Sequence, residues 1–268
     1  MKKLSFFAVV LAAVAFVACK GTQNNNNQDG TDSVKSFEQE QIEQNIKVQI
    51  DSLASDFGKL KPLPMFKKEG DGKYVLTDEE KQVKPDYLFA PSVAESAITL
   101  AEKYRAISAL SVDKEVAKLY DMPTDEYEEA ITKLASDIND PSFKVLDGVS
   151  NVFAASGDLY NAMNENGRIN YFWQLAASSI VEQLYVASQN SEKFIGAFDD
   201  ESVADITLRV ALLQDAIERL SAYDPELVPV TEAIKPLAVF NAITVDEFKT
   251  QLEQAKEDIA ASHKSLIK

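Results

Sequence analysis

The stretch Tyr171–Ser188 (YFWQLAASSIVEQLYVAS) decides the fold, because its side chains are apolar or small on nearly every face of a helix. A helix that is apolar all round is one that other elements surround. Its small residues Ala176, Ala177, Ser178 and Ser179 let neighbouring helices approach closely. We therefore expect Tyr171–Ser188 to be the central helix of a helical body.

Elsewhere, apolar residues recur at the three- and four-residue spacing that is typical of amphipathic helices. Five such stripes run over residues 42–57, 93–107, 127–138, 203–220 and 248–266. With the remaining helical sequence they predict an all-α fold, a single bundle of about eight helices. Short connections predict that most neighbouring helices are antiparallel.

Helix boundaries are marked by capping residues and prolines. Ser92 with Glu95 and Thr244 with Glu247 have the spacing of capping boxes, in which two side chains satisfy free backbone donors reciprocally. Pro236 lies inside otherwise helical sequence and predicts a kink or a broken helix. Further residues typical of helix starts are Thr124, Asp199 and Asp224.

Residues 60–90 do not follow a helical pattern. Three prolines interrupt this segment, and Glu69–Gly72 resembles a turn between two short extended runs. Thr77 with Glu80 then has the spacing of a cap on a single helical turn. We expect an irregular excursion with a short β-hairpin; long irregular segments of compact domains are often functional.

The first nineteen residues have the layout of a secretory leader. Lys2 and Lys3 precede a run of about a dozen residues, Leu4–Ala15, which is apolar except for Ser5 and too short to span a bilayer that needs ~20 residues. Cys19 follows, and it is the only cysteine in the chain. A signal anchor, or an ordinary signal peptide that ends near a cysteine, is the alternative interpretation.

The residues before Cys19 resemble the lipobox of bacterial lipoproteins: Val17 and Ala18 fit it, while Phe16 stands where leucine is usual. The resemblance implies cleavage before Cys19, a diacylglycerol thioether on its sulfur and acylation of its amine. Several acyl chains make membrane attachment effectively permanent, whereas one chain binds only marginally. Lys20, rather than aspartate, follows the cysteine, and in the resemblance this favours the outer membrane.

These features divide the chain into three parts. Residues 1–18 are predicted to be a lipoprotein signal peptide. Residues 19–33 are predicted to be the lipidated cysteine and a disordered polar tether, because they cannot bury enough apolar surface to offset the entropy of ordering. Residues 34–268 are predicted to form the helical domain. The body resembles the many helical lipoproteins of Gram-negative envelopes.

The chain is strongly acidic. Its formal charge is −16, and removal of Lys2 and Lys3 with the leader makes it −18. Nucleic-acid binding depends on clustered lysine and arginine, so this charge argues against nucleic acid as a partner. It also opposes adhesion to anionic lipid, which leaves the acyl anchor on Cys19 as the expected contact with the bilayer.

Few residues are suited to catalysis. The single histidine, His263, lies five residues before Lys268, where a positive charge near a helix C-terminus is the expected role. Ser111 and Lys114 match S-x-x-K, but Asp113 between them is expected to cap a helix at a junction. We therefore predict no catalytic residues and no cofactor.

Carboxylates are plentiful, but they do not form a metal motif. H-E-x-x-H and cysteine pairs are absent from the sequence, so no metal site is predicted. The acidic groups around Asp125 and Asp199 are expected to stabilise helix N-termini. Tyr171–Trp173 could stack on a sugar, although core packing is the expected role, and Arg168 is expected to pair with a carboxylate.

The function that we expect from the sequence is that of a membrane-anchored binding or scaffold module of the cell envelope. Its partners would be envelope proteins or a small ligand, on the periplasmic face or at the cell surface. The alternative is a hydrolase that uses paired carboxylates on envelope glycan, which would need a concave pocket holding two acidic groups in unequal environments. A structural lipoprotein without a specific ligand remains a third interpretation.

Overall fold

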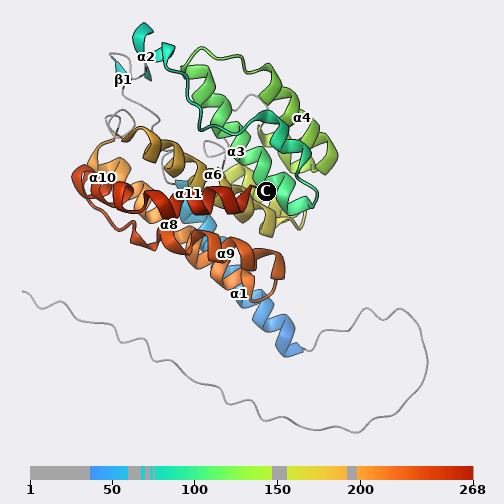
Figure 1. Ribbon diagram of the computed structural model, residues 1–268. Coiled ribbons are helices and arrows are strands. Elements are labelled where there is room, and N and C mark those ends of the chain that lie inside the picture. The colour runs from blue at the N-terminus through green and yellow to red at the C-terminus, as the bar shows by residue number, and fades with distance from the viewer. Residues whose placement is uncertain are drawn as a thin grey trace, which may run out of the picture.

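A computed structural model describes residues 37–59, 68–69, 73–74, 76–146, 156–191 and 198–267. Helix α6 (Ile169–Gln189) runs through the middle of the molecule and contacts α3, α5, α8, α9, α10 and α11 (Figure 1). Its residues from Phe172 to Ser188 are buried except for Tyr185, which is partly buried. The predicted central helix is therefore confirmed.

On one side of α6 lie η1 (Pro91–Glu95), α3 (Leu100–Leu119) and α4 (Asp125–Ile138). The capping box that starts α3 is Thr99 with Glu102, not Ser92 with Glu95 as predicted. Thr99 Oγ1 accepts the Glu102 N–H at 3.2 Å, and Glu102 Oε2 accepts the Thr99 N–H at 2.8 Å. The earlier pair instead lies in the 3₁₀ turn η1, whose N-cap residue, Ala90, makes no side-chain cap.

The opposite side contains α8 (Asp200–Ser221), η4 (Pro225–Leu227) and α9 (Val228–Ile234). The Asp199 side chain caps α8 by accepting the Ser202 N–H at 2.8 Å, as predicted. After α9 the chain tightens into the 3₁₀ helix η5 (Lys235–Val239), which contains Pro236. Pro236 therefore lies at a broken helix, as its position predicted.

The C-terminal apolar stripe belongs to two helices rather than one. These are α10 (Val245–Gln254) and α11 (Lys256–Leu266), which meet at Ala255. Thr244 caps α10 by accepting the Glu247 N–H at 3.3 Å, while Glu247 accepts the N–H of Ile243 instead of completing the reciprocal box.

Helix α1 (Phe37–Lys59) packs on α8 and on α5 (Ser156–Glu165), and η2 (Pro141–Leu146) also lies against α5. The contact of α1 with α5 is close, since a Cβ atom added to Gly58 would lie 3.2 Å from the Gly157 Cα atom. The first part of α1 extends beyond the helical body (Figure 1).

Within residues 60–90, Lys68–Glu69 (β1) pairs antiparallel with Lys73–Tyr74 (β2), so that Lys68 faces Tyr74 and Glu69 faces Lys73. This agrees with the short β-hairpin that was predicted. Thr77 then starts α2 (Asp78–Gln82) with a complete capping box.

The described residues form ten α-helices, and the predicted all-α class is confirmed. The expected number of about eight was too low, because α2 is only five residues long and the last stripe divides at Ala255. None of these described helices combines the length and the apolar character that crossing a membrane requires. Cys19, the predicted signal peptide and the predicted tether lie outside the described residues.

Candidate functional site

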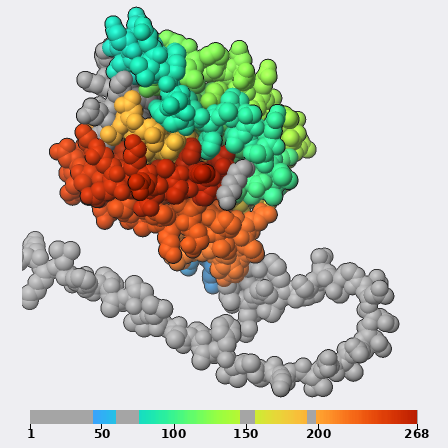
Figure 2. Space-filling view, viewed as in Figure 1, coloured from blue at the N-terminus to red at the C-terminus, as the bar shows by residue number. Residues whose placement is uncertain are grey.

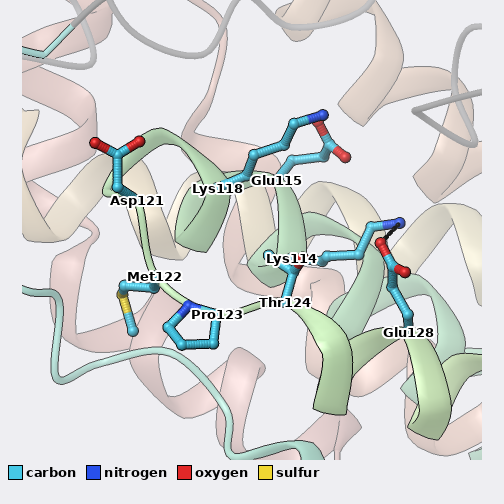
Figure 3. Close-up of a pocket in the computed structure, with 8 residues that line it drawn as sticks. All are labelled: Lys114, Glu115, Lys118, Asp121, Met122, Pro123, Thr124 and Glu128. Carbon is cyan, nitrogen blue, oxygen red and sulfur yellow. Dashed lines mark ion pairs between the residues drawn. The ribbon is translucent and has the colours of Figure 1, made fainter.

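A solvent-open hollow of about 500 Å³ lies where α3 ends and α4 begins (Figure 3). The last turns of α3 contribute Lys114, Glu115 and Lys118, and the loop and α4 supply the remaining lining residues, which are Asp121, Met122, Pro123, Thr124 and Glu128. The loop turns sharply because Asp121 has a left-handed φ of 51°, a conformation that aspartate tolerates better than most residues.

The charges in this hollow are mixed and solvated. Lys114 Nζ lies 3.9 Å from Glu128 Oε1 across the mouth between α3 and α4 (Figure 3). Lys81 Nζ lies 2.8 Å from Asp121 Oδ2, and its hydrogen bond lowers the pKa of that exposed carboxyl. Such a surface can bind polar groups of either charge, but it offers no buried nucleophile or base.

A second open hollow of about 620 Å³ runs along α4 and shares Glu128 with the first. Its lining residues are Asp125, Glu128, Glu129, Thr132, Lys133 and Ser136. The predicted acidic group therefore lies in the first turn of α4. The two hollows are neighbours because both are lined by Glu128, and we call their combined lining residues the α3–α4 surface.

The S-x-x-K residues do not form a catalytic pair. Ser111 Oγ donates to the Ile107 carbonyl oxygen at 2.6 Å, while Lys114 lines the outer hollow. Asp113 was expected to cap a helix junction, and this prediction was wrong. It lies in the second half of α3 with an exposed fraction of 0 %, because the helix continues to Leu119 and turns this side chain toward α6.

Asp113 belongs to a buried cluster with Glu182 of α6 and His263 of α11, which we call the Glu182 cluster. His263 Nδ1 lies 2.9 Å from Glu182 Oε2, although its N–H is not aligned for a hydrogen bond. Asp113 Oδ2 accepts the Phe89 N–H at 2.9 Å. The cluster thus links α3, α6, α11 and the chain before η1.

His263 was expected to be a charge beside a helix dipole, and this prediction was wrong. The inward face of α11 places its ring between two aromatic rings, with centroids 4.1 Å from Phe89 and 3.7 Å from Tyr185. Burial lowers the pKa of His263 to about 4, so the imidazole is neutral at physiological pH.

Burial acts in the opposite direction on the two acids. It raises the pKa of Glu182 to about 8. It also raises the pKa of Asp113 well above its ordinary value, and the neighbouring Glu182 carboxyl adds to this effect. Each group of the cluster is therefore shifted toward its uncharged form.

No family model, curated protein or solved structure matches this chain.

The other predicted site residues have structural contacts. Phe172 and Trp173 are buried, as core packing predicts, and Tyr171 stacks on Tyr104 at 4.7 Å between ring centroids. The Arg168 guanidinium lies 5.6 Å from the centre of the Tyr171 ring. Within the part of the chain that the structure describes, no three acidic, histidine or cysteine residues are arranged to hold a metal ion.

The hydrolase interpretation needs acidic groups of unequal environment in a concave pocket. The carboxyl groups of raised pKa, Asp113 and Glu182, line neither hollow of the α3–α4 surface. Glu182 was not predicted to be a site residue, although it is the one charged residue in Tyr171–Ser188. A lone carboxyl in a helix predicted to be buried requires a partner, and that requirement could have identified it.

Proposed function

We propose that this chain is a lipoprotein anchored through Cys19, and that its helical body is a binding module of the cell envelope. The leader and the lipobox-like residues support the anchor. The position of α1 supports a tethered arrangement, because its first part extends beyond the body (Figure 1). Lipid would then hold the protein at the membrane, most simply at the outer membrane, while the helices remain available to a partner.

The α3–α4 surface is the observation that carries the binding proposal. It joins two hollows of about 500 and 620 Å³ and presents lysines beside carboxylates. Mixed charges at a solvated surface favour selective contact with a polar partner whose charges are arranged in the complementary pattern. An envelope protein is the partner that we propose, and a small polar ligand is the other candidate.

The anchor is tested by Cys19→Ala, which removes the only thiol that could carry a diacylglycerol. We expect the variant to leave the membrane fraction, whereas wild type and the tether variant Thr22→Ala remain in it. Mass spectrometry of the wild-type N-terminus should find an acylated cysteine. An unmodified thiol, or equal membrane retention of Cys19→Ala, would contradict the anchor.

The binding surface is tested by photo-crosslinking in intact cells. A crosslinking residue replaces Lys118 or Thr132 on the α3–α4 surface, and the same residue replaces Thr250 on α10 as the control. We expect a discrete adduct from the first two positions and none from the third. Absence of an adduct at both surface positions, or equal adducts at all three, would overturn the protein-binding proposal.

A further inference from the structure

The two carboxyl groups of the Glu182 cluster have oxygens that no protein donor satisfies. Asp113 Oδ2 is bound by the Phe89 N–H, and Glu182 Oε2 faces His263 Nδ1. No donor from the described residues reaches Asp113 Oδ1 or Glu182 Oε1. The two carboxyl groups are, however, close enough for their interaction to raise the pKa of Asp113 and to lower that of Glu182.

Two ionised carboxylates cannot hydrogen-bond, because each can only accept. If both were charged they would also repel one another in a buried environment, where a lost hydrogen bond is expensive. One proton held between them changes this, since the protonated carboxyl becomes a donor to the other. A single shared proton therefore supplies a partner to both carboxyl groups.

The described groups that interact with the two carboxyls provide no fixed positive charge to replace that proton. These groups are Tyr87, Tyr127, Tyr185 and His263, and the tyrosines in turn interact with Asp86, Tyr120 and Glu126. The Lys84 Nζ atom donates to the Tyr120 carbonyl oxygen rather than to either carboxyl. The tyrosines keep their protons, since burial raises the pKa of Tyr127 to about 12 and raises that of Tyr87 and Tyr185.

The cluster lies behind α11 and behind the chain around Phe89. Helix α11 lies at the surface of the molecule (Figure 2), with Ile259, His263 and Leu266 buried and Lys256–Asp258 exposed. The chain at Phe89 is held by the Asp113 carboxylate, by the ring of His263 and by the Tyr127 hydroxyl, which donates to the Phe89 carbonyl oxygen at 2.8 Å.

We propose that the protonated Asp113–Glu182 pair works as a latch, fastening α11 and the segment around Phe89 to α3 and α6 and releasing them when the pair ionises in alkaline conditions. Ionisation of Glu182 would leave a buried negative charge with a neutral imidazole beside it. Undocking of α11 lets water reach the carboxyl groups, so opening hydrates the charge.

The direction of the pH effect follows from the proton affinities. The folded-state pKa of Glu182 is about 8 and its ordinary value is 4.5, so its stabilisation is complete below pH 4.5 and is lost as pH rises toward 8. His263 acts oppositely, and its contribution is lost as pH falls from 6.5 to about 4. Above pH 6.5 only the carboxyl effect remains, so alkaline release is the expected behaviour.

The test compares the full-length chain in mild detergent at about pH 6.5 and pH 8.5. We expect the Tm of wild type to fall by roughly 5 °C between these conditions. After correction for the intrinsic exchange rate, hydrogen exchange should accelerate at least about tenfold in α11 and around Phe89 but not in α8, because release lowers the local opening free energy. Uniform acceleration, or no change, would overturn the latch.

Glu182→Gln is the decisive variant, because its amide N–H group can donate to Asp113 at any pH and does not titrate. We expect the alkaline fall in Tm to shrink to less than half, and Asp113→Asn should act in the same direction. Glu115 lies on α3, as Asp113 does, but it lines the α3–α4 surface. Glu115→Gln should therefore show the same alkaline fall in Tm as wild type. Equal falls in Glu182→Gln and Glu115→Gln would refute the proposal.

Infrared difference spectroscopy keeps the proposal testable if the variants do not fold. Wild type at pH 6.5 should show the band of a protonated buried carboxyl, which disappears on titration to alkaline pH. The double variant Asp113→Asn with Glu182→Gln should lack that band. A wild-type spectrum without an alkaline-sensitive carboxyl band would be sufficient to overturn the latch.

Discussion

The two ends of α6 are equally buried but are surrounded by different chemistry. Near its start, Trp173 packs with Phe57, Tyr160 and Phe172, with ring centroids 5.2–6.5 Å apart in edge-to-face contacts; we call this the Trp173 cluster. Nine residues later, the same helix places Glu182 beside a second carboxyl and an imidazole. One end is an aromatic core, and the other is a buried set of titratable groups.

The two ends of α6 are therefore stabilised by different kinds of interaction. The Trp173 cluster depends on burial of apolar surface and on ring geometry, neither of which changes with pH. The Glu182 cluster is stable only while its groups remain in their uncharged or proton-sharing forms. A helix that spans both is fixed permanently at one end and conditionally at the other.

The largest expected effect comes from removing the centre of the Trp173 cluster. Trp173 has an exposed fraction of 0 %, and Trp173→Ala should lower the free energy of unfolding by about 3–5 kcal/mol, since it loses apolar burial and leaves a cavity. Urea denaturation at constant pH measures this change. Tyr223→Ala is the control, because that side chain is 48 % exposed, and its cost should stay below about 1 kcal/mol.

The change caused by Trp173→Ala should be the same at pH 6.5 and at pH 8.5. A cost that varied strongly with pH would mean that the two ends of α6 are energetically coupled. The separation between a permanent and a conditional end would then fail.

Most of the fold was predictable, because helix class and burial follow from local patterns. The spacing of Val203, Val210 and Ile217 predicted the buried face of α8, and the apolar residues around Trp173 predicted the central helix. The start of α3 was not predicted correctly. Ser92 and Thr99 are each followed three residues later by glutamate, which is the pattern of a capping box. Only the path of the chain around Pro91 decides which of them caps a long helix.

The Glu182 cluster could not be predicted from local sequence patterns. Asp113, Glu182 and His263 are separated by 69 and 81 positions, so no sequence motif joins them. His263 was predicted to be a charge beside a helix dipole because it is near the chain end, yet the packing of α11 on α6 buries it. Only tertiary packing shows that these three residues are neighbours.

A second prediction isolates the histidine of the Glu182 cluster. Because the folded-state pKa of His263 is about 4 and its ordinary value is 6.5, its contribution to stability is present above pH 6.5 and is lost as pH falls toward 4. The loss amounts to up to about 3 kcal/mol. In His263→Gln this acid-dependent loss should be absent.

The informative quantity is the stability of wild type minus that of His263→Gln, measured by urea denaturation at intervals from pH 7 to pH 4. Taking the difference cancels much of the opposing carboxyl titration and the fixed cost of losing the stacked ring. Lys264→Gln, at the exposed neighbouring position, is the control and should follow wild type. A difference that stays constant over this range would show that His263 does not titrate with folding.

The smallest expected effects come from deleting one hydroxyl at each end of α6. Tyr127 donates to the Phe89 carbonyl oxygen at 2.8 Å, and Tyr160 donates to Asp51 Oδ1 at 2.5 Å. Tyr127→Phe and Tyr160→Phe should each lower the free energy of unfolding by about 1 kcal/mol, the usual net value of one hydrogen bond. Only Tyr127→Phe should also accelerate hydrogen exchange at Phe89 and in α11, because only that hydroxyl holds the segment stacked on His263. Equal exchange in the two variants would mean that Phe89 is held by the core as a whole, and that the Glu182 end of α6 is no more conditional than the Trp173 end.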